Sequence, residues 1–379
     1  MCSHTLFALI VLTGASLGHP AWGQDTPTPP KGHPECKPHD NLTVVDVSFP
    51  IHKLTARKGG RSVSVLEVLR DDFKINTVFR YYDHIKETIE NKTLQSAEVD
   101  AIIAAGLSIG VVFQHYNDDP TKFLEARVGV RDAERALALA DKFRQPFDTT
   151  IYFGIDGPER HLKPLTKEFV TSTGKSINSD REKKLKSEFV EVRLNELREK
   201  YKSEGNSSDW IENELATPAM RSNVDQTAQV RLDSYIKRYD RFLKDGPRVF
   251  KTHDLGKLHE KDMLPVIGEY FADIKRTFVA YRKNHNQNGF KLGLYCTPLA
   301  CLEGVKKEWA EYVWLSPEGR FDPEYEEMKG KADSWHMLQY PESQGCMTWS
   351  DRSATIDLNQ INPKKGSNIG QWKTRRKPG

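Results

Sequence analysis

The sequence has 379 residues, of which 37% are hydrophobic, enough for one large core. Its 56 Lys and Arg residues nearly balance its 53 Asp and Glu residues, so the charge gives no reason to expect nucleic acid as a partner. No stretch of about 18 apolar residues follows the N-terminal region, and we therefore expect no transmembrane anchor.

The N-terminus has the features of a cleaved signal peptide over residues 1–23. A short apolar run at 6–17 is followed by small residues ahead of Gln24, and the run is too short to span a bilayer as a helix. We therefore expect the mature protein to be secreted or periplasmic. Residues 24–41 are rich in proline and are expected to form an extended linker.

Removal of the signal peptide would leave an even number of cysteines in a compartment where disulfides persist. These four are Cys36, Cys296, Cys301 and Cys346. Closeness in sequence favours a pair of Cys296 with either Cys301 or Cys346. Because the spacing is not that of a CxxC pair, we expect neither a zinc site nor thioredoxin-like chemistry. We predict that at least one disulfide forms.

Strand and helix patterns alternate from residue 42 onward, which favours parallel strands. Helical spacing of apolar residues appears after Ser96, over 131–144 and over 267–281. Eight segments have strand character: 43–49, 76–83, 107–114, 149–156, 290–296, 311–315, 334–340 and 354–358. The predicted fold is α/β, a (β/α)8-type, TIM-like barrel over residues 42–362 whose last strands have short connections.

The alternation stops over residues 157–249, where the sequence is densely charged. Val190, Leu194, Leu197 and Tyr201 still form a stripe at helical spacing, so this segment is predicted to be a helical insertion with a solvated face. Residues 363–379 form a basic tail, and its positive cluster at 373–377 is interpreted as a frayed end rather than a binding patch.

Polar residues at the C-terminal ends of the strands are the candidates for chemistry, because active sites of such barrels lie there. They are Asp46, Arg80, Tyr81, Tyr82, Gln114, Asp156, Tyr295, Gln339 and Asp357. Asp46 interrupts an apolar strand and would be costly to bury without partners, which favours a functional cluster. The alternatives are an ion pair of Asp46 with Arg80 that only closes the barrel, and a helix N-cap role for Asp156. We predict that Asp46, Asp156, Asp357 and Arg80 converge at one mouth.

Several short motifs, in this order, resemble the bacterial secreted glycoside-hydrolase-like domain of unknown function that is related to the family 25 lysozymes. They lie at 79–82, 94–98, 105–107, 112–114, 132–133, 151–156, 338–340 and 356–359. The resemblance covers about residues 43–156 and 262–362 and omits the insertion.

The resemblance implies that Asp46, Asp156 and Asp357 match the acidic positions of the family. Family 25 enzymes also place a Glu two residues after the Asp of the fourth strand, where this sequence has Pro158, and Glu159 follows. Hydrolysis needs a proton donor within reach of the leaving oxygen. Our hypothesis is that Asp156 and Glu159 form the catalytic pair, with Glu159 directed inward; the alternative is that Glu159 lies on the surface.

The remaining candidates have supporting roles in this hypothesis. Asp46 and Asp357 shape the charge around the pair, and the substrate-binding residues are Arg80, Tyr81, Tyr82, Gln114, Tyr295 and Gln339. The three tyrosines would offer ring faces to sugar rings.

The leading interpretation is a secreted barrel that acts on cell-wall polysaccharide or peptidoglycan without a cofactor. No phosphate-binding loop or Gly-x-Ser-x-Gly elbow is present, and the spacing of His253 and His259 does not suggest a metal site. The alternatives are a glycan-binding module without turnover and a scaffold whose insertion recruits a protein partner.

Overall fold

The computed structural model describes residues 42–58, 60–84, 92–203, 205–318, 320–340, 347–349 and 352–377. Eight of its strands form a closed barrel, and they coincide with the eight predicted segments. In barrel order they are β1 (Val44–Asp46), β4 (Thr77–Tyr82), β5 (Ser108–Phe113), β6 (Thr150–Ile155), β7 (Lys291–Cys296), β8 (Tyr312–Leu315), β9 (Met337–Gln339) and β11 (Arg352–Ile361). The predicted TIM-like barrel is therefore confirmed.

The last strand differs from the expected parallel arrangement. β1 and β4 to β9 are parallel to their neighbours, whereas β11 is antiparallel to both β9 and β1 and closes the barrel between them. No helix separates β9 from β11 in the described residues, as the predicted short connections imply. Three strands lie outside the barrel: β2 (Thr55–Lys58) pairs with β3 (Arg61–Ser64), and β10 (Met347–Trp349) pairs with β11.

The barrel interior is filled by large side chains that meet from strands on opposite sides. The Phe79 ring of β4 lies 5.5 Å from that of Tyr152 on β6 and 5.0 Å from that of Trp314 on β8. Glycines make room for them, because a Cβ at Gly110 would overlap the Phe79 ring and one at Gly293 the Tyr152 ring. The interior is thus a packed core, which leaves the site to the strand ends.

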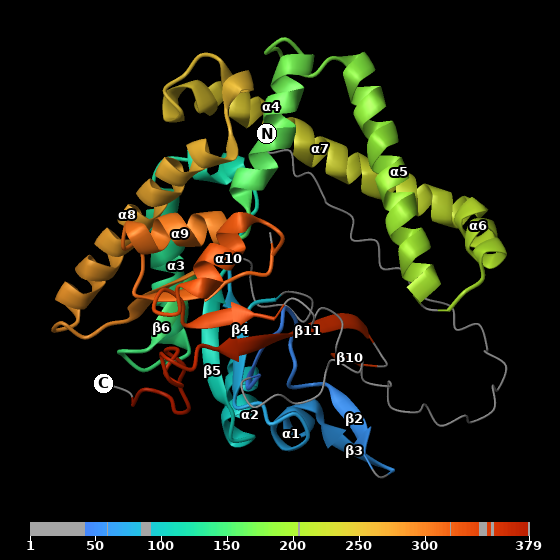
Figure 1. Ribbon diagram of the computed structural model, residues 1–379. Helices are drawn as coiled ribbons and strands as arrows, with labels where there is room; N and C mark the ends of the chain where they lie inside the picture. The colour runs from blue at the N-terminus through green and yellow to red at the C-terminus, as the bar shows by residue number, and fades with distance from the viewer. Residues whose placement is uncertain are drawn as a thin grey trace, which may run out of the picture.

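Helices surround the barrel (Figure 1). After the short α1 (Val65–Asp71), they are α2 (Ser96–Ala104), α3 (Val128–Lys142), α8 (Met263–Asn284), α9 (Pro298–Lys306) and α10 (Pro323–Gly330), with the short turns η1 (Pro120–Leu124), η2 (Leu255–Lys257) and η3 (Glu260–Asp262). They pack their apolar faces on the outer side of the sheet, where most of the core lies. In the part of the chain that the structure describes, no helix has the length and apolarity needed to cross a membrane.

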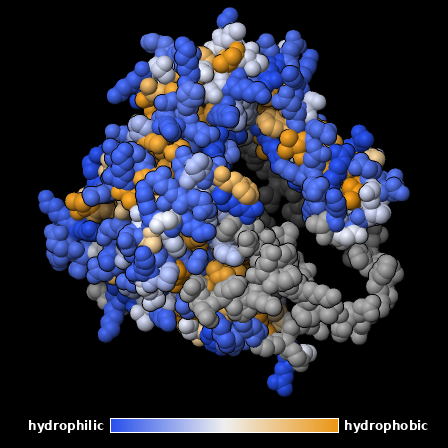
Figure 2. All heavy atoms as spheres, viewed as in Figure 1, coloured by the Kyte–Doolittle hydropathy of each residue, from blue (hydrophilic) through white to orange (hydrophobic). Residues whose placement is uncertain are grey.

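The charged insertion is helical, as predicted. It comprises α4 (Pro158–Thr171), α5 (Ser179–Ser203), α6 (Ser208–Ala216) and α7 (Pro218–Val249). The predicted stripe of α5 packs against α6 and α7 in a small core of its own around Leu197, Ile211 and Val224. Figure 1 shows this group projecting from the barrel, and its surface in Figure 2 is mainly hydrophilic. The return helix α7 contacts η1 at the barrel.

The C-terminal tail is not a frayed end, which corrects the prediction for its described residues. Trp372 is only 3% exposed and bridges to Ile109 at the start of β5. Ile369 joins the core inside the barrel, and its carbonyl accepts a hydrogen bond of 3.0 Å from the Tyr152 hydroxyl. Arg376 pairs with Asp141 at 2.6 Å. The tail therefore covers the N-terminal end of the barrel, opposite the candidate site.

One disulfide joins Cys296, the last residue of β7, to Cys301 in α9. The prediction of at least one disulfide is thus confirmed, and of the two pairings favoured for Cys296 the structure has the one with Cys301. Cys36 and Cys346 lie outside the described residues, as do the predicted signal peptide and linker.

Candidate functional site

Three aspartates come together at the C-terminal end of the barrel. Asp46 ends β1 and is the register partner of Asp357 on β11, while Asp156 directly follows β6. Asp46 is only 4% exposed, and the charges of both other aspartates raise its pKa. Residues 110 positions or more apart in the sequence thus share one acidic cluster.

Neutral side chains hold this cluster together. The side-chain amide of Asn359 donates to Asp46 Oδ1 at 2.8 Å, and the Tyr81 hydroxyl reaches Asp46 Oδ2 at 3.4 Å. Gln339 Nε2 lies 3.5 Å from Asp46 Oδ1, and its Oε1 accepts a hydrogen bond of 2.8 Å from the Tyr295 hydroxyl. None of these partners carries a positive charge, so the hydrogen bonds orient the carboxylates without neutralising them.

The electrostatics of the cluster favour the protonated acids. Burial, followed by repulsion from Asp357, raises the pKa of Asp46 well above its usual range, although hydrogen bonds from Asn359 and Tyr81 offset part of the effect. Burial raises the pKa of Asp357 to about 6. Burial, with the nearby charges of Glu318 and Asp118, raises the pKa of Asp156 to about 6 as well. Such a group exchanges a proton near neutral pH, which is what acid catalysis requires.

Asp156 faces a small cavity of about 280 Å³ lined by polar residues of the β4, β5 and β6 ends. Gln114 Nε2 donates to Asp156 Oδ2 at 2.8 Å, and Gln114 Oε1 accepts from Lys92 Nζ at 2.8 Å. The Lys92 ammonium lies 4.8 Å from the centre of the Tyr81 ring. The positive charge of Lys92 lowers the pKa of Asp156 and so offsets part of the rise that burial causes.

Arg80 and Tyr82 do not face the cluster, which corrects the prediction that Arg80 converges with the aspartates. Strand residues alternate between the two faces of a sheet, and Phe79 and Tyr81 take the inner face of β4. Arg80 pairs outside the barrel with Glu98 of α2, with Nε and Oε1 2.8 Å apart. The suggested ion pair of Arg80 with Asp46 is therefore wrong as well.

Tyr82 points outward with Arg80. Its hydroxyl donates to Gln145 Oε1 at 2.9 Å, and the ring stacks on Phe143 in the core between barrel and helices. Tyr82 therefore cannot offer its ring to a sugar at the mouth, as the substrate-binding role assigned to it from the sequence requires.

Glu159 is buried rather than on the surface. It lies in the first turn of α4, is 1% exposed, and its Oε1 accepts a hydrogen bond from the Thr297 hydroxyl. Its Oε2 has no hydrogen-bond partner in the described structure. Burial raises the pKa of Glu159, and the Thr297 hydrogen bond opposes this shift. The side chain lines a cavity of about 940 Å³ together with residues of η3 and α10, not the cavity that Asp156 lines.

Sequence reasoning missed Glu318, whose charge is the largest electrostatic contribution to the raised pKa of Asp156. Glu318 follows β8 by three residues, and one of its carboxylate oxygens would lie 3.2 Å from a Cβ placed on Gly157. Asp118, in the loop after β5, also acts on Asp156. The signal for Glu318 was its position just after the predicted strand at 311–315.

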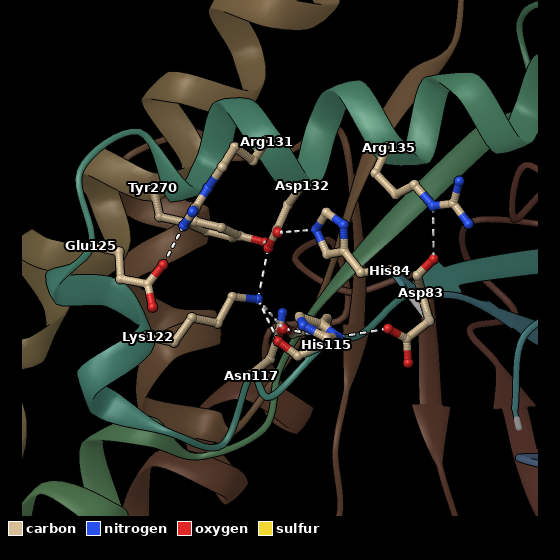
Figure 3. A network of polar contacts seen from close by, with 11 residues as sticks. Asp83, His84, His115, Asn117, Lys122, Glu125, Arg131, Asp132, Arg135 and Tyr270 are labelled. Carbon is tan, nitrogen blue, oxygen red and sulfur yellow. Dashed lines mark hydrogen bonds and ion pairs between the residues drawn. The ribbon is translucent and has the colours of Figure 1, made fainter. Parts of the chain in front are cut away.

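A second polar network was also missed (Figure 3). Lys122 Nζ, in η1, donates to Asp132 Oδ2 at 2.7 Å and to Asn117 Oδ1 and the His115 carbonyl at 2.6 Å each. Asp132 also contacts His84 at 2.9 Å and the Tyr270 hydroxyl at 2.8 Å. Here the buried acid has a cation beside it, and the pKa of Asp132 is lowered: hydrogen bonds from His84 and Lys122 outweigh burial.

The acidic cluster lies at the C-terminal strand ends of a closed barrel, where the active sites of such barrels are found. Residues 69–180 match the family described as the Rv2525c-like, glycoside hydrolase-like domain. The match begins in α1 and ends at the start of α5, and it includes Asp156 and Glu159. Residues 69–180 are therefore similar to a glycoside hydrolase-like domain, and the resemblance to that domain drawn from the sequence is confirmed.

Two solved structures are similar to this chain. The Mycobacterium tuberculosis Tat-secreted protein Rv2525c, crystallised with L-tartrate, has 13% identity and a TM-score of 0.41, over 88% of this chain and 99% of that one. An uncharacterized B. stearothermophilus protein has 10% identity and a TM-score of 0.39, over 84% and 95%. No curated protein matches the sequence. Among the described residues, no group of three or more His, Cys, Asp or Glu side chains is placed to hold a metal ion.

Proposed function

We propose that this protein is a secreted glycan-acting barrel that hydrolyses cell-wall polysaccharide, with Asp156 as the proton donor. The observation that carries the proposal is the state of Asp156: a partly buried carboxyl group at the end of β6 whose pKa is raised to about 6. An acid with this pKa holds its proton for part of the time at neutral pH and can deliver it to a leaving oxygen.

The surroundings of Asp156 fit a sugar substrate. Tyr81 and Tyr295 supply apolar ring surface, while Gln114 and Gln339 supply amide groups that can bind hydroxyl groups. Asp46 and Asp357 place negative charge or a shared proton beside the reacting sugar, where an oxocarbenium-like transition state develops positive charge.

The second carboxylate of the reaction has two candidates. Glu159 contacts Thr297 and lines another cavity, whereas the negative charge of Glu318 raises the pKa of Asp156. We propose Glu318 for this role in place of Glu159. With an N-acetylated sugar, the acetamido group of the substrate can take the place of a protein nucleophile, and Asp156 would then act with a supporting aspartate.

The test is the release of reducing sugar from purified peptidoglycan. Asp156→Asn should reduce the rate by about 100-fold to 10,000-fold, the usual contribution of a general acid. Glu318→Gln should reduce it strongly and Glu159→Gln only slightly, with circular dichroism to verify folding. Asp209→Asn, on the exposed face of α6, is the matched control and should have wild-type activity.

A second candidate function is glycan binding without turnover, favoured by Pro158 at the position where family 25 enzymes place a Glu. If the unmutated protein releases no sugar from any cell-wall glycan yet sediments with insoluble peptidoglycan, hydrolysis is wrong and binding stands. A fold by itself does not establish a reaction.

A further inference from the structure

A third cavity lies between the barrel and the insertion, beside the network of Figure 3. It has a volume of about 540 Å³. One wall comes from the loops after β4 and β5 and from η1 and α3, and the other wall comes from α7. The α7 wall consists of Ser234, Lys237, Arg238 and Arg241. The site exists only because the insertion folds back onto the barrel.

The acids around this cavity already have partners within the protein, and for two of the three the partner is a cation. Lys122 pairs with Asp132 at 2.7 Å, and its three hydrogen bonds use all of its protons. Glu125 accepts from Arg241 at 2.6 Å and also pairs with Arg131. The remaining acid, Asp119, caps η1 through the backbone and hydroxyl of Thr121.

Two cations on the α7 wall have no such partner. Lys237 and Arg238 make no ion pair with any described residue, and the buried Nε of Arg238 has no hydrogen-bond acceptor in the described structure. A buried donor without an acceptor is costly, and an anion in the cavity would supply one. The uncompensated charge of the cavity is therefore positive.

His84 and His115 line the same cavity, and one ring nitrogen of each already contacts a carboxylate. His84 Nε2 contacts Asp132 at 2.9 Å and His115 Nδ1 contacts Asp83 at 2.6 Å, and the two rings lie 4.8 Å apart. A carboxylate on one ring nitrogen orients the ring, and the other nitrogen can then donate to a ligand. In the described structure, neither His84 Nδ1 nor His115 Nε2 has a hydrogen bond.

We propose that this cavity is a binding site for an oxyanion, a carboxylate or phosphate group, held by Lys237 and Arg238 from α7 and by His84 and His115 from the barrel. His115 and Tyr116 also line the small cavity of Asp156, so the two spaces adjoin. Resting on the proposed function, we assign the oxyanion to an acidic substituent of the same glycan, bound beside the bond that Asp156 would protonate.

The experiment is isothermal titration calorimetry of the full chain with two probes, D-glucuronate and inorganic phosphate, and with D-glucose as the uncharged control. We expect glucuronate to bind and glucose not to bind. The double variant Lys237→Ala/Arg238→Ala should bind at least about tenfold more weakly, since hydrogen bonds to charged groups contribute that much or more. The matched control, Lys183→Ala/Lys184→Ala on exposed positions of α5, removes the same charge and should bind normally.

Each outcome decides the proposal. Binding of both probes, or of phosphate alone, supports an oxyanion site, and phosphate alone moves the source from a carboxylated to a phosphorylated group. No binding of either probe overturns the site, as does equal weakening in both double variants. Because calorimetry needs no turnover, it can be repeated on Asp156→Asn, in which binding should persist even if hydrolysis fails.

Discussion

Two clusters of ionisable side chains lie close together at the mouth of this barrel, and they differ in how their charges are compensated. Asp46, Asp156 and Asp357 are held by amides and hydroxyl groups, and the pKa of each is raised. Asp132, on α3, has the ammonium of Lys122 and a histidine beside it, and its pKa is lowered. Each cluster contains a buried acid, Asp46 in one and Asp132 in the other, so burial alone does not distinguish them.

The difference indicates what each cluster can do. A buried acid without a cation keeps its proton to higher pH and can exchange it with a substrate, at the expense of stability when it ionises. A buried acid paired with Lys122 remains charged and ties η1 to α3 and to the loop after β5. We therefore propose chemistry for the aspartate cluster and structural support for the pair of Lys122 and Asp132.

The largest expected effect comes from breaking the paired cluster. Lys122→Met removes the cation and leaves the carboxylate of Asp132 buried without it, so the free energy of unfolding should fall by about 3–5 kcal/mol. Urea unfolding at pH 7 measures this. The control is Lys257→Met, which breaks an ion pair with Asp254 in η2 that is exposed to solvent, and which should change stability little. Equal stabilities of the two variants would contradict a structural role for the network.

Much of the fold was predictable because each barrel strand is a short apolar run and most runs are separated by amphipathic helices. The direction of β11 was not, since an apolar run carries no information about which way a strand runs. The packing of the tail was not predictable either, because Ile369 and Trp372 are isolated apolar residues in a polar and basic segment. They become buried only where the tail meets the N-terminal end of the barrel.

The candidate site was predictable where a polar residue interrupts or ends an apolar strand, as Asp46 and Asp156 do. The orientation of Arg80 was not, because every residue from Thr77 to Arg80 is buried, inside or outside the barrel, and the sequence shows no alternation. The Lys122 network depends on contacts between a loop, a short 3₁₀ turn and two helices. Such long-range contacts leave no pattern in the local sequence.

The next largest effect is on the free energy of unfolding, which an Asp→Asn substitution should change in opposite directions in the two clusters. The pKa of Asp156 is raised from 3.8 to about 6, so the folded state binds this proton more tightly than the unfolded chain, and stability falls as pH rises through that window. Asp156→Asn removes the penalty and should raise the free energy of unfolding at pH 7.5 by up to about 3 kcal/mol, with no gain at pH 4. Urea unfolding across this pH range measures the change.

Asp132→Asn is the matched variant in the other cluster and should have the opposite effect. Because the folded pKa of Asp132 is lowered, its contribution is present above the unfolded pKa and is lost as pH falls. The variant should therefore be less stable than wild type at pH 7.5 and approach it in acid. If both variants shift stability in the same direction at pH 7.5, the contrast between the clusters is wrong.

The smallest expected effect concerns the hydrogen bond that tempers Asp156. Gln114 donates to Asp156 Oδ2 at 2.8 Å and lowers the pKa of that carboxyl, against the effect of burial. Gln114→Ala removes the donor and should raise the pKa of Asp156 further, by up to about one unit. A hydrogen bond to a charged group contributes about 1.5 kcal/mol, which corresponds to about one pKa unit. The pH range over which Asp156→Asn gains stability over its parent runs from the unfolded to the folded pKa of Asp156, so its upper end should move to higher pH when both carry Gln114→Ala. Tyr295→Phe serves as the control, because its hydroxyl donates to Gln339 and not to Asp156, and it should leave that range where it is in the wild type. A range that does not move with Gln114→Ala would mean that burial and the charge of Glu318 alone set the proton affinity of Asp156, and the amide would then be left with a role in binding the substrate.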